Sequence, residues 1–384
     1  MSKYWNKMEI MRQGKRFLKN EKEKGNDGEL FISQDRPAFF VNKDYYTVKT
    51  SSNYDFSDNE RKSIADFYGN NYRIDRSNNT IMVSKNDLDR FLNTRCELLT
   101  LHTDKLIGSI VSLIIPLHIN VPGIDNKILV DQGDRINFYK SDANVIVFAC
   151  ASFLILDSKM RGKGMGMALI QESLQILYDN GGLGAYFINK VSRCDNSLSL
   201  VSWYYPLNFD KLDACKYDYS RDYKSYFVNN LEGVGLDVKK VVEENARIAY
   251  DFYFNSMKGK KFYFSPSYEY WLKWLESFPT YILLEKSEIV GLFCFNSDNI
   301  RYPLHRVELM TGKLIICIGK QPETLKSSLF IAKSLYDMLT LYQVGDLNEK
   351  VLTSVFAQKS HKSYINFFNT RLLLSASDFH APLF

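Results

Sequence analysis

The sequence predicts an α/β fold built from two consecutive units, each with a mixed, mostly antiparallel sheet flanked by helices. Short apolar runs between turn residues indicate strands, and runs with an apolar residue every three to four positions indicate helices. The order of these runs in the first half recurs in outline in the second half. We expect an N-terminal arm over residues 1–57, a first unit over 58–220 and a second unit over 221–384.

The first unit is predicted from the runs between residues 58 and 189. Its last two strands flank an amphipathic helix, and strands joined in this way run parallel. In chain order we expect helices over 58–68 and 85–93, strands over 97–103, 106–115 and 145–156, a helix from near Gly164 to the turn at 180–182, and a strand over 184–189.

A glycine-rich turn joins the strand over 145–156 to this helix. It has the pattern R-x-x-G-x-G and consists of Arg161, Gly162, Lys163, Gly164, Met165 and Gly166. Closely spaced glycines let a ligand approach the backbone, and N–H groups at the start of a helix lack acceptors within it. Such a loop suits a phosphate group, which the charges of Arg161 and Lys163 would also attract. The alternative is a solvated basic turn.

The second unit is predicted to keep the element order without this loop. We expect helices over 238–255 and 267–276, strands over 280–285, 288–296 and 313–319, and a final helix over 324–342. The connection over 319–323 reads Gly-Lys-Gln-Pro-Glu and has no R-x-x-G-x-G pattern. The sequence therefore predicts one ligand site, in the first unit.

Composition excludes several classes of function. The chain has 384 residues, of which 45% are hydrophobic, which is enough for sizeable cores. A formal charge of +5 with acids and bases interspersed does not indicate nucleic-acid binding. The first 24 residues are too charged for a signal peptide, and the longest apolar stretch, 106–121, is interrupted by Gly108, Pro116 and His118, so we expect no transmembrane segment.

The six cysteines are far apart and form no C-x-x-C pair, so we expect reduced thiols, a cytoplasmic location and no metal. We also expect the protein to be a monomer. The five histidines are scattered, and the chain has no G-x-S-x-G, H-E-x-x-H or P-loop motif. Hydrolase, zinc-protease and P-loop chemistry are therefore not indicated.

The order of a strand, an R-x-x-G-x-G loop, a helix and a second strand resembles the coenzyme A site of the GNAT acyltransferases. The doubled order resembles the N-myristoyltransferases, which consist of two GNAT-like halves with acyl-CoA bound by the first. Several segments are similar to those of that family and occur in the same order: Tyr4-Trp5-Asn6, Asn71-Tyr72, Leu106-Ile107-Gly108, Phe153-Leu154-Ile155-Leu156 followed by 159–163, and 203–212 (WYYPLNFDKL).

The resemblance implies transfer of a fatty acyl group from myristoyl-CoA, a co-substrate rather than a bound cofactor, to the amine of an N-terminal glycine on a peptide or protein. It implies that the amides of Phe153 and Leu154, at a bulge in the strand, stabilise the oxyanion; the alternative is two ordinary core residues. Residues 161–166 would hold the diphosphate. Tyr4 and Trp5 would cover the donor, unless they are docking anchors.

The resemblance also implies that the C-terminal carboxylate, here that of Phe384, is the base. The segment after Phe367-Phe368-Asn369 is shorter than the family's tail and does not match it. At a reach of at most roughly 3.5 Å per residue, the alternative is that this tail does not return to the first unit. Asp378 or His380 could then take the role of base, although exposed polar residues are the simpler interpretation of both.

The acceptor side is expected to involve Tyr72, Asp75, Trp203 and Tyr204. Here the sequence departs from the family, because Arg73-Ile74-Asp75-Arg76 replaces an acidic run and Tyr204 replaces a histidine. We therefore expect binding of acyl-CoA to be better kept than catalysis. The alternatives to an active N-myristoyltransferase-like enzyme are an inactive relative that binds acyl-CoA, or has a structural role, and a GNAT N-acetyltransferase.

Overall fold

The structure is a computed structural model. It describes residues 30–32, 46–72, 79–94, 96–119, 145–179, 182, 184–190, 197–220, 222, 237–368, 370–372 and 375–384. Tyr4, Trp5 and Asp75 lie outside the described residues, as do most of the expected N-terminal arm and residues 73, 74 and 76.

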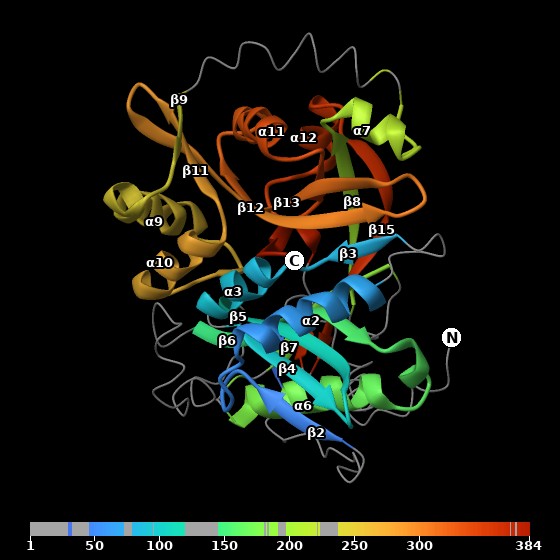
Figure 1. The fold of residues 1–384 in the computed structure, drawn as a ribbon. Helices are drawn as coiled ribbons and strands as arrows, with labels where there is room; N and C mark the ends of the chain where they lie inside the picture. The colour runs from blue at the N-terminus through green and yellow to red at the C-terminus, as the bar shows by residue number, and fades with distance from the viewer. Residues whose placement is uncertain are drawn as a thin grey trace, which may run out of the picture.

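The first half of the chain contains the helices and strands around the glycine loop, mostly in the lower part of Figure 1, although its last strand and last helix lie in the upper part. These are β1 (Leu30–Ile32), β2 (Thr47–Thr50), α2 (Asp58–Asn71), β3 (Thr80–Met82), α3 (Lys85–Asn93), β4 (Glu97–His102), β5 (Leu106–Ile119), β6 (Val145–Leu156), α6 (Met165–Asp179), β7 (Gly184–Asn189), β8 (Leu198–Pro206) and α7 (Phe209–Ala214).

The second half contains a similar set, mostly in the upper part of Figure 1. It comprises β9 (Asp237–Lys240), α9 (Glu243–Met257), β10 (Phe262–Phe264), α10 (Tyr268–Ser277), β11 (Thr280–Glu285), β12 (Glu288–Tyr302), β13 (Val307–Gly319), α11 (Glu323–Leu335), β14 (Met338–Tyr342), α12 (Glu349–Ser354), β15 (Gln358–Phe368), β16 (Thr370–Leu372) and β17 (Phe379–His380).

One 15-stranded sheet joins the two halves within the described residues. Its order is β17-β10-β5-β6-β7-β15-β8-β14-β13-β12-β11-β9, with β4 also beside β5, β2 beside β4, and β3 beside β12. Most neighbours are antiparallel, whereas β6 pairs with β7, β13 with β14, and β10 with β17 in parallel. The mixed, mostly antiparallel fold class and the predicted parallel pair around α6 are thus confirmed.

The strands of the two halves cross over at the centre of the sheet. β15 pairs with β7 on one side and with β8 on the other, while β8 also pairs with β14. Near the end of the chain, β17 pairs with β10, which pairs with the end of β5. Figure 1 accordingly shows the C-terminus in the middle of the molecule. The division at residue 220 remains a prediction.

Two predicted helices are wrong in part. A single helix was predicted over residues 324–342, but α11 ends at Leu335 and Met338–Tyr342 form the strand β14. The residues of β14 are in a strand because they pair with β13 and β8. Of residues 238–255, the first three belong to β9, which pairs with β11, and α9 begins at Glu243. In both cases pairing with a distant strand overrides a local helical pattern.

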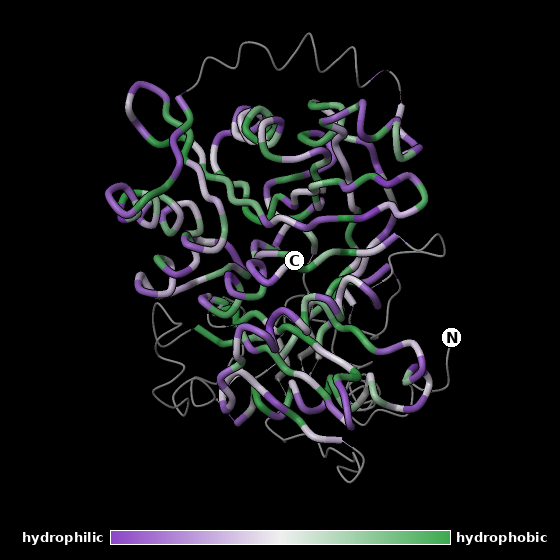
Figure 2. Tube along the Cα trace, viewed as in Figure 1, coloured by the Kyte–Doolittle hydropathy of each residue, from purple (hydrophilic) through white to green (hydrophobic). Residues whose placement is uncertain are grey.

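Apolar side chains concentrate in the strands, and polar ones at the outward turns, such as the β11–β12 hairpin in Figure 2. No helix within the described residues is long and apolar enough to span a membrane. In the first half, helices cover both faces of β5: the Tyr68 hydroxyl on α2 donates to Ser109 Oγ, at 3.0 Å, and Ser112 Oγ is 2.8 Å from Ser173 Oγ on α6. Ser109 and Ser112, an odd and an even residue of β5, therefore face different helices.

Candidate functional site

A cavity of about 630 Å³ lies where β6 and β7 separate. The two strands are in register from Phe148 opposite Gly184 to Cys150 opposite Tyr186. Residues beyond this point, 152–154 on β6 and 187–189 on β7, line the cavity instead. The wedge between two parallel strands thus opens a space within the sheet, beside α6.

The glycine loop closes one end of this cavity. Gly162 and Gly164 have φ angles of +79° and +86°, a region that glycine enters without a steric penalty. The first backbone hydrogen bond of α6 runs from Ala168 N–H to the Gly164 carbonyl, at 3.1 Å, and the amides before it lack intrahelical acceptors. Arg161, Gly162, Gly164 and Gly166 line the cavity. These main-chain donors can therefore hold an anion.

The other two loop residues lie elsewhere. The Lys163 side chain is exposed and does not line the cavity, whereas Met165 packs against the cluster that contains Leu99, Ile107 and Leu169. Their predicted roles in holding the donor therefore gain no support from this geometry.

Arg161 connects the loop to the end of α2. One of its guanidinium N–H groups donates to the Asn71 carbonyl, at 2.9 Å, and more weakly to the Leu156 carbonyl, at 3.4 Å. The carbonyls at the end of a helix attract cations. Arg161 thus faces the cavity and also holds Asn71, the neighbour of the cavity-lining Tyr72.

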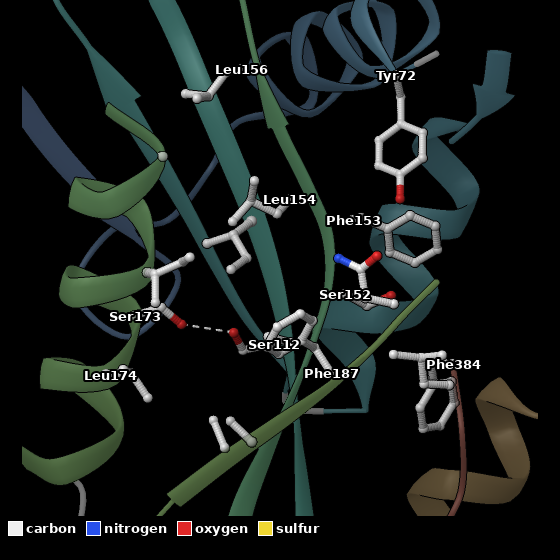
Figure 3. A pocket seen from close by; sticks show the side chains of 18 of the residues that line it. Tyr72, Ser112, Ser152, Phe153, Leu154, Leu156, Ser173, Leu174, Phe187 and Phe384 are labelled. Carbon is white, nitrogen blue, oxygen red and sulfur yellow. Dashed lines mark hydrogen bonds between the residues drawn. The ribbon is translucent and has the colours of Figure 1, made fainter. Parts of the chain in front are cut away.

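An apolar channel extends from the loop along α6. Gly166, Ile170, Ser173 and Leu174 form one stripe of the helix at positions i, i+4, i+7 and i+8. They cover about 12 Å of helix axis at 1.5 Å per residue. Small residues complete the opposite wall on the strands: Ala149, Ala151 and Ala185. Figure 3 shows the hydrogen bond between Ser112 and Ser173 on this side of the cavity.

A β-bulge in β6 lies beside the channel. Ile155 pairs with Ser109, and Ser152 pairs with Val111, so that Phe153 and Leu154 together oppose Ile110. Phe153 has a φ of +52°, which is unusual for a residue with a side chain. Both residues line the cavity. The bulge interrupts the ladder here, as the oxyanion role of these two amides requires.

The Phe153 ring holds the bulge in place, since it is buried among Tyr68, Tyr72 and Phe91 with ring centroids 6.3, 6.2 and 5.5 Å away. By contrast, Leu154 is 38% exposed. Packing of Phe153 offsets the cost of its left-handed conformation, which is of order 1–3 kcal/mol.

Residue 384 lies at the same cavity as the bulge. Its ring packs against Trp274 and Phe278, at centroid distances of 5.7 and 5.2 Å, and the preceding Pro382 carbonyl accepts a hydrogen bond of 2.9 Å from the Tyr186 hydroxyl. Figure 3 shows Phe384 on the side of β6 where Phe153 and Tyr72 lie. The expectation that a short tail fails to return to the first half is wrong, because pairing of β17 with β10 carries the chain back.

The two alternative bases lie outside this cavity. The Asp378 carboxylate is bound by the Lys261 ammonium, at 3.4 Å, and by Ser375, which lower its pKa against the effect of burial. His380 lies beside Gly345 at a separate small cavity, and its pKa is lowered by burial and by Lys260. Neither residue lines the site.

The predicted acceptor residues are separated by the fold. Tyr72 lines the cavity, and burial raises its pKa. Trp203 is buried in the core on β8 and donates through Nε1 to Gln343, at 3.3 Å. The Tyr204 hydroxyl donates to the Asp218 carbonyl, at 3.1 Å. Neither of these two residues lines the cavity, so their predicted role gains no support.

Lys313 is a cavity residue that sequence reasoning missed. Its ammonium is 2.8 Å from Asp298 Oδ2, on the neighbouring strand β12, and the two side chains are 20% and 5% exposed. Burial alone would lower the pKa of Lys313, but the Asp298 carboxylate outweighs this and raises it. A single lysine at the start of the apolar run 313–319 gives no signal that distinguishes it from a surface residue.

The donor set does not indicate a metal centre, since the described residues contain no group of three His, Cys, Asp or Glu side chains placed to hold an ion. The chemistry that the cavity offers is therefore that of main-chain donors, cationic side chains and an apolar channel.

No protein-family model and no curated protein sequence matches the chain. Solved structures do. A Saccharomyces cerevisiae N-myristoyltransferase with bound myristoyl-CoA is 12% identical and has a TM-score of 0.70, and the match covers 93% of this chain and 90% of that one. A second structure of that enzyme with myristoyl-CoA is 13% identical, has a TM-score of 0.67 and is covered over 94% of both chains.

A third structure of the yeast enzyme, with myristoyl-CoA and inhibitors, is 14% identical, with a TM-score of 0.66 and coverage of 90% of this chain and 84% of that one. At such identities the likeness concerns the fold. It confirms at that level the resemblance that the sequence motifs indicated: the chain has the fold of the N-myristoyltransferases.

Proposed function

We propose that the protein is an acyltransferase that moves a fatty acyl group from acyl-CoA to the amine of an N-terminal glycine. One observation carries the proposal: the glycine loop, the bulge at Phe153 and Leu154, and residue 384 all border a single cavity. A thioester donor needs an anion site for its diphosphate, an oxyanion site at its carbonyl and an apolar channel for its acyl chain, and the cavity offers all three.

The donor would enter from the glycine loop. The amides at the start of α6 and the Arg161 guanidinium would hold its diphosphate. Its thioester arm and the acyl chain beyond it would follow the apolar lining that extends from the loop, including the stripe of α6. Myristoyl-CoA, present in the structurally similar yeast enzymes, is the donor that we propose.

The amine of the acceptor would attack the thioester carbonyl beside the bulge. The amides of Phe153 and Leu154 would stabilise the oxyanion of the tetrahedral intermediate, and loss of one such donor typically costs about 3 kcal/mol of barrier height. The base that the resemblance implies is the α-carboxylate of Phe384, which would accept the proton that the amine loses. Collapse of the intermediate would then expel the coenzyme A thiolate, leaving an amide.

The test combines binding with transfer. Titration calorimetry with myristoyl-CoA and acetyl-CoA should show tighter binding of myristoyl-CoA, and labelled myristate should pass to a peptide that begins with glycine but not to its N-acetylated copy. Binding without transfer would favour the inactive relative, and a preference for acetyl-CoA would favour the acetyltransferase. If neither thioester binds, the proposal fails.

The role of Phe384 has a separate test. Two glycines added after Phe384 would displace the α-carboxylate, so kcat should fall about a hundredfold or more, within the usual range for loss of a general base. Binding of myristoyl-CoA should stay unchanged. The matched control adds the two glycines at the N-terminus. An unaltered kcat in the C-terminally extended protein would exclude the carboxylate as the base.

A further inference from the structure

Two charged side chains line the described walls of the cavity, and both are cations. The proposed donor accounts for Arg161, which borders the glycine loop. It does not account for Lys313, which comes from β13 in the second half of the chain. Burial of a lysine costs free energy unless its charge has a partner. Asp298 is such a partner, but it does not explain why Lys313 lines the cavity.

The ion pair is oriented with its positive end at the cavity. Lys313 lines the cavity and Asp298 does not, and the Asp298 carboxylate is the more deeply buried of the two. An ammonium group donates three hydrogen bonds, and the partner found for it among the described residues is a single carboxylate oxygen, Asp298 Oδ2. The ammonium therefore retains donors for a ligand in the cavity.

A second polar group lies directly opposite Lys313. Asn296 pairs with Lys313 in the β12–β13 ladder, and opposed residues share one face of a sheet. Asn296 is fully buried, and neither its Oδ1 nor its Nδ2 has a hydrogen-bond partner within the described part of the chain. Unsatisfied buried amides are rare in native proteins and call for a ligand or a water.

Lys313 lies toward the acceptor end of the cavity. Lys313 and Tyr72 both line the cavity, and Tyr72 packs beside the Phe153 ring of the bulge. Tyr72 also lies on the side of β6 opposite the channel residues Ser173 and Leu174 in Figure 3. The donor's acyl chain and diphosphate are accordingly assigned to other parts of the cavity.

From this arrangement we infer that Lys313 selects acceptors that carry a carboxylate side chain close to the amine that is acylated. The inference rests on the proposed function and specifies its acceptor class. The spare N–H groups of the ammonium bind the carboxylate, and the Asn296 amide supports the same group directly or through a water. Acceptors with a basic residue at that position are repelled.

The experiment compares short peptides that begin with glycine and carry Asp, Asn or Lys at one of positions two to five. Transfer by the wild-type protein should be at least tenfold more efficient, in kcat/KM, for Asp than for Asn at one of these positions, and weakest for Lys. The dissociation constants of the Asp and Asn peptides should differ by the same ratio when the protein is saturated with a non-reactive thioether analogue of myristoyl-CoA. This binding measurement tests the preference even if the protein has no catalytic activity.

The informative variant changes both members of the ion pair, K313M with D298N, because K313M alone leaves a buried carboxylate uncompensated. The double variant should bind the thioether analogue as the wild type does but should lose the preference for Asp. K320M is the matched control, since Lys320 pairs with Glu285 at the exposed surface, at 3.1 Å; it should keep the preference.

Three results would overturn the inference. One is an equal Asp-to-Asn ratio in the wild type and the double variant. Another is a preference for Lys in the wild type. The third is an equal loss for all peptides in the double variant, which would mean that Lys313 acts on the base and not on the acceptor. Failure of the proposed function is distinct from these, because then neither acyl-CoA nor its thioether analogue binds.

Discussion

The β6–α6 connection in the first half and the β13–α11 connection in the second half have the same topology and opposite character. Each joins a strand to the helix that precedes a parallel neighbour. The first connection contains Gly162, Gly164 and Gly166 and borders a cavity of about 630 Å³. At the second, Thr324 and Leu325 are fully buried and fill the corresponding crossing.

The second connection satisfies its own polar groups. Lys320 N–H donates to the Val290 carbonyl, at 2.8 Å, and both the amide and the hydroxyl of Thr324 donate to the Lys320 carbonyl, at 2.9 and 2.7 Å. The start of α11 thus lies against protein, whereas the start of α6 faces a cavity. The comparison indicates that the fold tolerates either arrangement and that small residues at the crossing decide which one forms.

The largest expected effect comes from Gly162→Leu, which places a side chain in the β6–α6 connection. This connection is open, because it borders the cavity, whereas the β13–α11 connection is closed. A side chain there would project where the diphosphate is proposed to lie, so the Kd for myristoyl-CoA should rise about a hundredfold, or about 2.7 kcal/mol. Titration calorimetry measures it. Gly259→Leu is a close control, since the φ angles are +79° and +81° and, among the described residues other than the two chain neighbours, no atom lies within 4 Å of an added Cβ at either position.

Both leucine variants should lose similar stability, about 1–2 kcal/mol for a side chain forced into the left-handed region. Chemical denaturation should therefore give matching values while acyl-CoA binding differs between them. Equal binding by the two variants would remove the glycine loop from the donor site.

The open connection could be predicted from sequence because its signal is local. All parts of this signal lie within residues 145–179: an apolar strand, the spaced glycines and a helix with an apolar stripe. The bounds of β6 and α6 agree closely with the predicted ones. The bulge at Phe153 was expected from the resemblance alone. The closed connection was also indicated by the lack of the glycine pattern, but its β14 was mistaken for helix, since partners from β8 and β13 determine its state.

Residues brought in from distant segments could not be predicted. Lys313 reaches the site because β13 faces the cavity, and no periodicity identifies which lysine in a strand will be buried. The position of Phe384 depends on how β15 and β17 cross between the halves, so its distance along the chain was a poor guide. Conversely, Trp203 matched a motif and Tyr204 occupies the next motif position, but neither residue lines the cavity.

The next largest effect distinguishes Arg161 from Lys163, the two cationic residues of the open connection. Arg161→Ala removes a guanidinium that lines the cavity and also holds the Asn71 carbonyl. Because hydrogen bonds to charged groups contribute about 1.5–3 kcal/mol, the Kd for acyl-CoA should rise at least about tenfold, and its salt dependence should weaken. Calorimetry at two salt concentrations checks both expectations.

Lys163→Ala is the control for this change, because the Lys163 side chain is exposed and lies outside the cavity. Its Kd should stay within about twofold of wild type, as is usual for surface substitutions. If Arg161→Ala lowers stability but leaves the Kd unaltered, Arg161 only ties the loop to α2.

A smaller effect is expected at the closed connection. Thr324→Val keeps the shape of a fully buried side chain and removes the hydroxyl that donates to the Lys320 carbonyl. The free energy of unfolding should fall by about 1 kcal/mol, the usual contribution of a hydrogen bond. Binding of myristoyl-CoA should not change, since no residue of α11 lines the cavity. A weaker affinity in this variant would contradict the assignment of a single donor site to the first half.

The smallest effect concerns pH and the segment that leads to Phe384. Burial, with help from Lys260, lowers the pKa of His380 on β17 below its ordinary value, so the folded state favours the neutral ring. As pH falls through about 6.5, the unfolded chain takes up a proton that the folded chain does not, and stability is lost until the lower folded pKa is reached.

Denaturation between pH 7.5 and 5, run on the wild type and on His380→Gln, measures this loss, which should be smaller in the variant. Lys260→Gln should give an intermediate result, because it removes a cation that opposes protonation but leaves the buried site. Since β17 carries the chain back to the cavity, acid should weaken acyl-CoA binding in step with the loss of stability. Superimposable pH profiles of the wild type and His380→Gln would instead show that the ring does not hold the returning segment.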